Sequence, residues 1–474
     1  MHDRGLSAND RKRMALASGH IPLHGGMSPR IGRRMGPGQP KPKAQQTVAS
    51  VRRNLSVGRE MSRDFLTLAC YNAIATGQMS ILKAIYKTGK APQVDKNGNT
   101  PLHVAAKCGQ LRSLRWLLQH SNVPLLAKNA RGETCLHVAA LQGHLKCMQT
   151  IIVCKKEKPS IAVSERDNLG MTGLHHATIG NRERLVHWLV QEFGKDLCLV
   201  KSCDGVLAIH LAAAAGNRQC TELLAQACKG SVNMTDVFGA TPVFYAAQEG
   251  HLECLQYLIE HMDGSLKIVA FEGMTAFLSA AEGGHLHVMN YLLEKQGSEA
   301  LLSTTNDGAT VFHYVASTGN FHVLQYLLEI PNIGDLLRVT DAFDRNPAHD
   351  AAENGFVECL RMLVEAGISL YLPDKDGETP LSLAMRSGNP KCVLFARAVA
   401  DSTMDMASLK MLKKKLGSKF NQISGIVTVQ ALSRDAAICF KRDRKSNTVV
   451  VFRKREMNCD QIGEFTQEER QLPA

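Results

Sequence analysis

The sequence predicts an all-α solenoid of about ten helix-pair repeats with short β-hairpin fingers. A block of the form Asp/Asn-Gly-x-Thr-Pro-Leu-His-x-Ala-Ala-x-x-Gly recurs between residues 97 and 388, and its Thr position returns every 33 to 38 residues. Each copy is followed by an amphipathic stretch, such as HLECLQYLIEH at 251–261. One helix pair cannot cover its own apolar face, so neighbouring pairs are expected to stack into a continuous core.

The first helix of each repeat is expected to begin at a polar capping residue. A Thr or Asn side chain there accepts a backbone N–H, and a following Pro occupies the first helical position, where a missing N–H costs nothing. The predicted caps are Thr100, Thr134, Thr172, Thr241, Thr275, Thr310, Asn346 and Thr379. The fifth repeat has Leu207 in this position instead, and we expect Leu207→Thr to stabilise the protein by about 1 kcal/mol.

Each first helix is expected to end at a glycine, because the chain turns there through a left-handed conformation that other residues resist. Asn181 takes this place in the fourth repeat, and Asn is the next most tolerant residue. A second helix with a leucine-rich core face follows, as in FHVLQYLLEI at 321–330. With a degenerate first copy, the array spans residues 61–400.

The charge of the chain is concentrated at its ends. Residues 1–60 hold 12 basic and 3 acidic residues, and residues 401–474 hold 14 basic and 9 acidic residues. The array between them therefore has 30 basic and 32 acidic residues. Residues 1–60 are rich in Gly, Pro and Arg and predict a disordered basic arm. Residues 401–474 predict a flexible tail with a basic helix at 406–419 and short strands at 423–432, 436–443 and 447–456. No apolar run approaches the roughly 18 residues of a membrane span.

The cysteines and histidines recur at fixed positions of the repeat, which indicates structural roles. Five of the 14 cysteines follow the glycine position by four residues: Cys147, Cys220, Cys254, Cys359 and Cys392. We therefore expect buried thiols, with no disulfide and no metal site. The sequence has no phosphate-binding loop, nucleophile elbow or HExxH motif, so neither an enzyme nor a cofactor is expected.

A protein partner is expected to bind a concave groove formed by the fingers and first helices. Fingertips are usually polar, yet apolar residues occupy four of them: Leu169, Phe238, Phe271 and Phe343. The other predicted groove residues are Tyr245 and Tyr314, one residue after the motif histidine, and the acidic neighbours Glu249, Glu282 and Glu353. Aromatic anchors dominate many interfaces, and acidic residues favour a basic or mixed-charge segment, so we expect an extended or helical peptide across repeats five to nine. The alternative is that these aromatics pack between adjacent fingers.

The recurring block resembles the ankyrin repeat throughout, which implies a protein-binding array. Beyond this, DVFGATPVFYAAQEGHLECLQYL at 236–258 and NPAHDAAENGFVECLRMLVEAGISLYLPDKDGETP at 346–380 are similar to the corresponding repeats of espins, actin-bundling proteins of stereocilia and microvilli. The resemblance covers about 340 of the 474 residues. In espins the array binds the tails of class III myosins, so the resemblance implies a cytoplasmic, cytoskeleton-associated scaffold in actin-rich protrusions.

The chain departs from espins after residue 400, where it lacks the Pro-rich runs and the Glu/Lys/Arg-rich bundling module. Direct binding to actin filaments is therefore not expected, and the chain looks like a short isoform, a fragment or a relative. Two other functions remain open. One is an adaptor or inhibitor unrelated to actin, such as a ubiquitin-ligase substrate receptor. The other is a nuclear cofactor whose basic ends contact DNA. Nucleic acid is the less expected partner, and the lack of aromatic residues among the basic ones gives no support for RNA binding.

Overall fold

The computed structural model describes residues 63–89, 94–154, 162–331, 333–403, 438–443 and 448–453. The chain divides into two compact units, one ending at Phe343 and the other beginning at Asp344. The predicted arm at 1–60, the basic helix at 406–419 and the predicted strand at 423–432 lie outside the described residues. In the part of the chain that is described, no helix combines the length and apolar character needed to span a bilayer.

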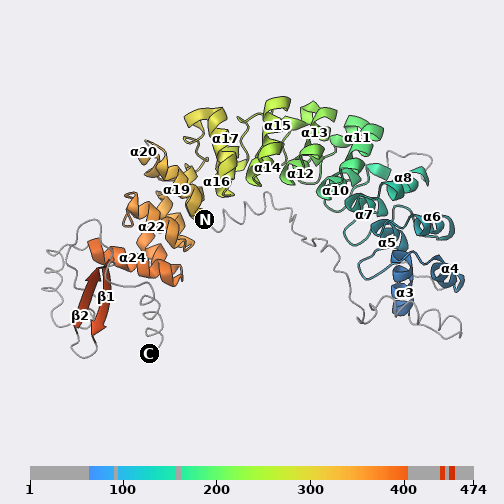
Figure 1. Ribbon diagram of the computed structural model, residues 1–474, viewed down its shortest axis with the longest axis horizontal. Helices are drawn as coiled ribbons and strands as arrows, with labels where there is room; N and C mark the ends of the chain where they lie inside the picture. Colours follow the sequence, from blue (N-terminus) through green and yellow to red (C-terminus); the bar gives the residue numbers. More distant parts are fainter. Residues whose placement is uncertain are drawn as a thin grey trace, which may run out of the picture. The chain divides into compact units, whose positions relative to one another are not determined.

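The first unit is a stack of helix pairs in two layers (Figure 1). The first helices of successive repeats contact one another in one layer: α3 (Arg63–Ala75), α5 (Pro101–Lys107), α7 (Cys135–Gln142), α10 (Gly173–Ile179), α12 (Ala208–Ala214), α14 (Pro242–Gln248), α16 (Ala276–Glu282) and α18 (Val311–Thr318). Each packs against the second helix of its own repeat: α4 (Met79–Lys87), α6 (Leu111–His120), α8 (Leu145–Cys154), α11 (Glu183–Cys198), α13 (Arg218–Ala227), α15 (Leu252–Met262), α17 (Leu286–Gln296) and α19 (Phe321–Glu329). Short turns of helix fall between repeats: η1 (Lys229–Asn233), η2 (Phe271–Gly273), η3 (Gly297–Glu299) and α20 (Gly334–Leu337). The predicted stack of helix pairs is confirmed.

The second unit contains two further helix pairs and a small sheet. Its helices are α21 (Pro347–Glu353), α22 (Val357–Glu365), α23 (Pro380–Arg386) and α24 (Pro390–Thr403), with α21 packed on α22 and α23, and α24 on the same two helices. Strands β1 (Ile438–Asp443) and β2 (Thr448–Arg453) pair antiparallel, with Ile438 opposite Arg453.

The fingers are tight turns, so the predicted β-hairpins are wrong in this detail. Among the described residues only β1 and β2 are strands. A finger of five residues leaves room for one closing hydrogen bond, as from the Asp95 N–H to the Asn99 carbonyl at 2.9 Å, and a ladder does not form.

The repeat register predicted from the sequence is confirmed at both ends of the first helices. All eight predicted caps, and Leu207 as well, immediately precede a helix. At the other end, Asn181 has a φ of 54° where the equivalent residue of the next repeat, Gly216, has 66°. The cysteines of the recurring core site are also buried as predicted, and none of the cysteines in the described residues is in a disulfide.

The caps work in two ways, depending on whether the motif histidine is present. Where it is absent, the Thr hydroxyl accepts the N–H three residues later, as Thr241 does from Phe244 at 3.2 Å. Where it is present, the histidine closes a capping box. In the third repeat the N–H of Thr134 donates to His137 Nδ1 at 3.1 Å, and its hydroxyl lies 2.9 Å from the same nitrogen.

Leu207 retains part of this arrangement, because its N–H donates to His210 Nδ1 at 3.1 Å. Its side chain is 0% exposed and belongs to the core. Replacing it with Thr would remove one to two buried carbon groups, each worth about 0.8 kcal/mol before any cavity penalty, against a capping gain of about 1 kcal/mol. The burial of Leu207 therefore reverses the sign that the sequence alone predicted.

The motif histidines also join neighbouring repeats. Because Nδ1 accepts a backbone N–H, the neutral ring carries its proton on Nε2, which donates to a carbonyl of the next repeat. These bonds run from His103 to Glu133 at 2.8 Å, from His137 to Glu165 and Met171 at 3.0 Å, from His175 to Val206 at 3.1 Å, and from His210 to Met234 at 3.0 Å. Burial lowers the pKa of His137, His175 and His210 to about 4.

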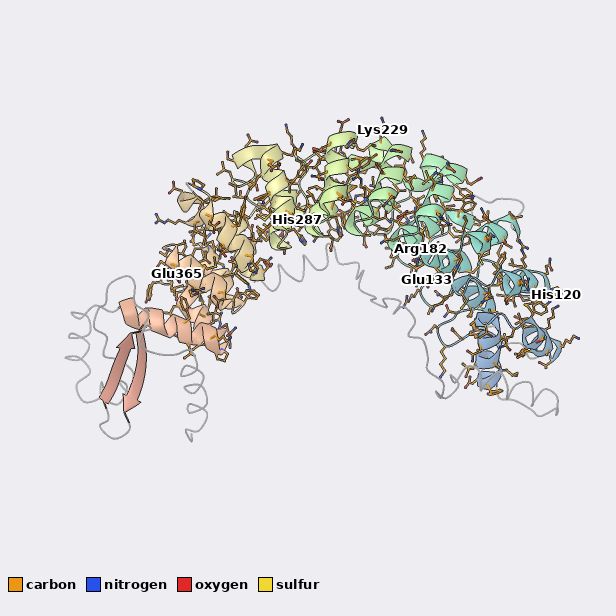
Figure 2. All side chains as sticks on the ribbon, viewed as in Figure 1. His120, Glu133, Arg182, Lys229, His287 and Glu365 are labelled. Atoms are coloured by element: carbon orange, nitrogen blue, oxygen red, sulfur yellow. The ribbon has the colours of Figure 1, made fainter. Side chains whose placement is uncertain are left out.

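A second set of bonds starts from the residue after Asn181 and after several of the helix-ending glycines. Arg182 Nε donates to the Leu141 carbonyl at 2.9 Å, and Figure 2 shows Arg182 on the stack. His251 reaches the Ala214 carbonyl at 3.0 Å in the same way. The ring of His251 lies so close to Gly216 that a Cβ there would come within 2.5 Å of it. The repeats of the first unit are thus linked by two rows of polar contacts in addition to the apolar core.

Candidate functional site

In most repeats the finger is held by the side chain of its first residue, whereas the finger of the seventh repeat begins with Ala270, whose side chain cannot accept a hydrogen bond. In the fourth repeat, Asp167 Oδ1 accepts the N–H groups of Leu169 and Met171 at 2.9 and 2.8 Å. Asp236 does the same in the sixth repeat for Phe238 and Ala240, both at 2.9 Å. Short polar side chains favour such turns because they bond to backbone N–H groups two and four residues ahead. The second and third residues of the finger therefore form its tip.

The fingertips of the first unit are joined by main-chain hydrogen bonds. In each case the N–H of a finger's second residue donates to the carbonyl of the third residue in the preceding finger. The bonds are Ala130 to Asn97 (3.0 Å), Asn168 to Arg131 (3.1 Å), Cys203 to Leu169 (2.9 Å), Val237 to Asp204 (2.9 Å), Phe271 to Phe238 (2.6 Å), Asn306 to Glu272 (2.7 Å) and Ala342 to Asp307 (2.6 Å). We call this row, from residues 96–97 to 342–343, the fingertip ridge.

The middle of the fingertip ridge exposes apolar side chains. Leu169, Val237 and Phe271 are 56%, 62% and 60% exposed, Cys203 is exposed, and Phe238 is half-buried. These residues come from four consecutive fingers, those of repeats four to seven, whose backbones are hydrogen-bonded to one another. Scattered exposed apolar residues are ordinary, but a contiguous row marks an interaction surface.

The predicted groove residues divide into several groups. Leu169, Phe238 and Phe271 lie on the fingertip ridge, and Phe343 is at its last tip, half-buried. Tyr314 is half-buried on α18. The acidic residues lie at the ends of first helices: Glu249 is exposed after α14, Glu282 is half-buried at the end of α16, and Glu353 bonds to Arg345 at 2.6 Å in the second unit.

Tyr245 is not an exposed anchor, and this prediction is corrected. Its side chain is only 5% exposed, and its hydroxyl donates to Asp236 Oδ2 at 2.8 Å. His176, at the same position of the fourth repeat, bonds to Asp167 Oδ2 at 2.9 Å. In these two repeats the residue at this position thus braces the finger of its own repeat. Burial raises the pKa of Asp236, and the Tyr245 hydrogen bond only partly offsets this.

Two ridge residues escaped the sequence analysis, Val237 and Cys203. Both occupy the second finger position, as Phe271 does, whereas Leu169 and Phe238 occupy the third. The sequence analysis selected only the larger apolar residues at the two tip positions, and including the smaller Val and Cys side chains there would have found both. The apolar row therefore begins one repeat earlier than the predicted span of repeats five to nine.

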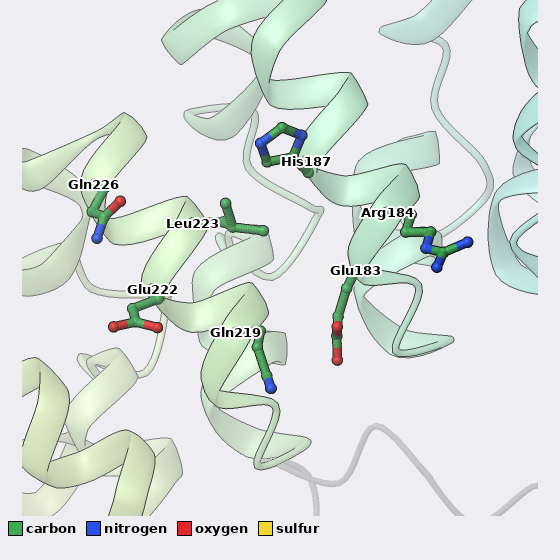
Figure 3. Close-up of a pocket in the computed structure, with 7 residues that line it drawn as sticks. All are labelled: Glu183, Arg184, His187, Gln219, Glu222, Leu223 and Gln226. Carbon is green, nitrogen blue, oxygen red and sulfur yellow. The ribbon is translucent and has the colours of Figure 1, made fainter.

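The first unit also has a shallow recess of about 430 Å³ on the layer of second helices (Figure 3). It lies between α11 and α13, and its lining residues are Glu183, Arg184, His187, Gln219, Glu222, Leu223 and Gln226. The side chains around it are mostly polar and belong to two neighbouring repeats. Among the described residues, no three His, Cys, Asp or Glu side chains are grouped closely enough to hold a metal ion.

Comparison with known proteins gives one consistent family. The family model described as ankyrin repeats (3 copies) matches residues 51–126, 121–201, 174–270, 209–303, 263–336, 296–374 and 333–397. The NF-kappa-B inhibitor alpha of Mus musculus is 31% identical over 118 residues, which is 24% of this chain and 37% of that protein. The Arabidopsis thaliana protein XBAT31, named as an E3 ubiquitin-protein ligase, is 30% identical over 141 residues, or 28% of this chain and 31% of that protein.

A third relative, alpha-latrotoxin-Lh1a of Latrodectus hasselti, is 34% identical over 112 residues, which is 23% of this chain and 8% of the toxin. The chain thus spans well under half the length of each of these relatives. Among solved structures, the human ASB11 ankyrin repeat domain is similar, with 22% identity and a TM-score of 0.39 over 48% of this chain and 98% of that one.

Proposed function

The chain belongs to the ankyrin-repeat family, and from this premise we propose that it is a non-catalytic scaffold that binds a partner protein through its fingertip ridge. The observation that carries the proposal is the contiguous exposed row of Leu169, Cys203, Val237 and Phe271. Burial of such side chains is the main favourable term in protein association, and residues of this type at the centre of a patch dominate binding energy.

The more specific proposal is a cytoskeletal partner. The stretches at 236–258 and 346–380 are similar to espin repeats, and in espins the corresponding array binds class III myosin tails. We therefore propose a cytoplasmic scaffold associated with the cytoskeleton in actin-rich protrusions, with a myosin tail segment as its partner. Fluorescence anisotropy of labelled class III myosin tail peptides against the full chain tests this directly. Binding no tighter than that of an unrelated peptide of equal charge would leave only the coarser proposal.

The rival proposal is an adaptor or inhibitor unrelated to actin, and the likeness to the NF-kappa-B inhibitor alpha and to XBAT31 supports it. Affinity capture from cell lysate on the full chain separates the two, because cytoskeletal motors would be retained in one case and other proteins in the other. Retention on DNA that falls steeply with salt would favour a nuclear cofactor instead.

The capture experiment needs a matched pair of variants. The double variant Val237→Ser with Phe271→Ser removes the centre of the fingertip ridge. The double variant Val153→Ser with Leu302→Ser removes two equally apolar side chains, 70% and 65% exposed, that lie outside the fingers. A specific partner should be lost from the first variant and kept by the second. Equal capture by both, or turnover of a substrate by the purified chain, would overturn the proposal.

A further inference from the structure

Basic side chains are gathered on the second helices of the first three repeats. Five of them are exposed on α4, α6 and α8: Lys83, Lys87, Arg112, Arg115 and Lys146. These three helices contain no Asp or Glu. Within the described residues, none of the five side chains is in an ion pair or a hydrogen bond. We call these five residues the basic surface.

The cations of neighbouring helices lie side by side. The two lysines of α4 are one turn apart and the two arginines of α6 are three residues apart, and both spacings place side chains on the same side of a helix. Helix α4 contacts α6 through the rings of Tyr86 and Trp116, whose centroids are 5.1 Å apart, and α6 packs against α8. The second helices form the outer layer of the first unit (Figure 1), and Figure 2 shows His120 there, at the end of α6. The basic surface thus spans three adjacent repeats of this layer.

The rest of this layer in the first unit has the opposite charge. The second helices from α11 to α19 carry eight acidic and four basic residues. One of these four cations, Lys295, is paired with Glu260 at 2.9 Å. Five unpaired cations on adjacent helices repel one another, so their segregation costs free energy in the isolated protein and creates a positive potential that attracts an anionic partner.

The surroundings of the basic surface favour one kind of occupant. The segments at 1–60 and 401–474 have an excess of basic residues, so neither has the net charge to cover it. A long nucleic acid or an anionic membrane would extend past α8 onto the acidic part of the layer and be repelled there, whereas a short acidic segment is matched to three repeats. Single-stranded nucleic acid also needs free aromatic faces for its bases, and the nearly parallel His120 ring, 4.8 Å away, already covers one face of Trp116.

We propose that the basic surface binds a short acidic segment of a partner protein, whose Asp and Glu side chains pair with its five cations. Arginine offers two parallel N–H donors to a carboxylate, so Arg112 and Arg115 are the expected anchors. The half-buried Trp116 supplies an apolar contact of the kind that is enriched at the centre of interfaces. This second surface goes beyond the proposed function, because the fingertip ridge consists of fingers and includes none of these residues. A scaffold with both surfaces can hold two partners at once.

Fluorescence anisotropy of a labelled peptide against the full chain tests the proposal. The acidic peptide is Gly-Ser-Glu-Asp-Glu-Leu-Glu-Asp-Glu-Ser-Gly, and a neutral peptide replaces every Glu by Gln and every Asp by Asn. The basic-surface variant combines Lys87→Gln, Arg112→Gln and Arg115→Gln. A control variant removes three exposed cations that lie outside the second helices: Lys229→Gln, Lys267→Gln and Arg338→Gln. Both variants lower the net charge by the same amount, so attraction of the peptide to the basic ends of the chain is equal in both.

The native chain should bind the acidic peptide and not the neutral one. The basic-surface variant should bind the acidic peptide at least fivefold more weakly, since three exposed ion pairs are lost at about twofold each, and the control variant should stay within about twofold of the native chain. The unfolding midpoints of both variants should match that of the native chain, because the substituted side chains are exposed.

Three results would overturn the proposal. Equal weakening by the two variants would show attraction by net charge without a binding surface. Binding of duplex DNA or of phosphatidylserine vesicles that depends on the basic surface, with no such dependence for the acidic peptide, would show a different class of partner. Self-association of the native chain that the basic-surface variant abolishes would show that a second copy occupies the surface.

This proposal and the proposed function fail separately. The variant Val237→Ser with Phe271→Ser leaves the basic surface intact and should bind the acidic peptide as the native chain does, and loss of the peptide from this variant would contradict the assigned location. If that variant captures the same proteins as the native chain, the proposed function is wrong and the basic surface is unaffected.

Discussion

Lowering the pH from 7 to 5 should destabilise the first unit through three buried histidines. Burial lowers the pKa of His137, His175 and His210 to about 4, whereas a histidine in an unfolded chain has a pKa of about 6.5. Between these values the unfolded chain binds more protons than the folded one. The free energy of unfolding therefore falls as the pH falls through this window. Above the window the rings are neutral in both states, and the protein keeps its full stability.

The magnitude follows from the two pKa values. At pH 5 each ring is almost fully protonated in the unfolded chain and mostly neutral in the folded one, which costs roughly 2 kcal/mol per ring relative to pH 7. The three rings together give roughly 5 kcal/mol, a large share of the stability of a typical domain. The geometry agrees with the direction, because a proton added to His175 Nδ1 would face the Thr172 N–H that donates to it at 3.1 Å.

Denaturant titrations at pH 7, 6 and 5 measure the effect. The fluorescence of the two tryptophans, Trp116 in α6 and Trp188 in α11, reports on repeats next to these histidines. His175→Gln should be less stable at pH 7 but lose roughly 2 kcal/mol less than the native chain between pH 7 and 5. His187→Gln changes an exposed histidine on α11 and should keep the native pH dependence. A constant unfolding free energy from pH 7 to 5, or identical slopes for both variants, would refute this reasoning.

Three substitutions test other contacts by the same denaturant titration. Leu207→Thr should cost about 1 kcal/mol net, because the lost burial outweighs the new cap, and a rise in stability would show that the cap dominates. Gly216→Ala should cost at least about 2 kcal/mol, since the backbone is left-handed and the methyl group meets the His251 ring; a loss below 1 kcal/mol would argue against that contact. Tyr245→Phe should cost about 1 to 3 kcal/mol by leaving Asp236 Oδ2 without its hydroxyl donor, while binding of the partner protein stays unchanged; weaker binding at native stability would restore Tyr245 as an anchor.

The sequence determined the repeat register because caps and glycines obey local rules. Thr100 and Thr379, at the two ends of the array, both precede a helix, and Asn181 adopts the left-handed conformation in place of a glycine. Each of these outcomes depends on a residue and its neighbours within one turn of helix. A sequence without any structure can therefore predict them.

The surroundings of a side chain were harder to predict, because they depend on neighbouring repeats and on the finger of the same repeat. Tyr245 follows the motif histidine and was expected on the surface, yet its hydroxyl meets the carboxylate of Asp236, nine residues earlier. Leu207 stands at a capping position, and its complete burial comes from the packing around it. Periodicity gives the position of a residue within the repeat but does not identify the partner that occupies the space beside it.

The bonds that join one fingertip to the next use only N–H and carbonyl groups. A substitution at a tip therefore changes what is displayed without moving the adjacent tips, provided that the new residue keeps its N–H. Proline alone among the standard residues would interrupt the row at the second finger position. Surfaces of this kind can be re-targeted one residue at a time, and a library that varies positions 169, 203, 237 and 271 would sample new specificities on an unaltered backbone.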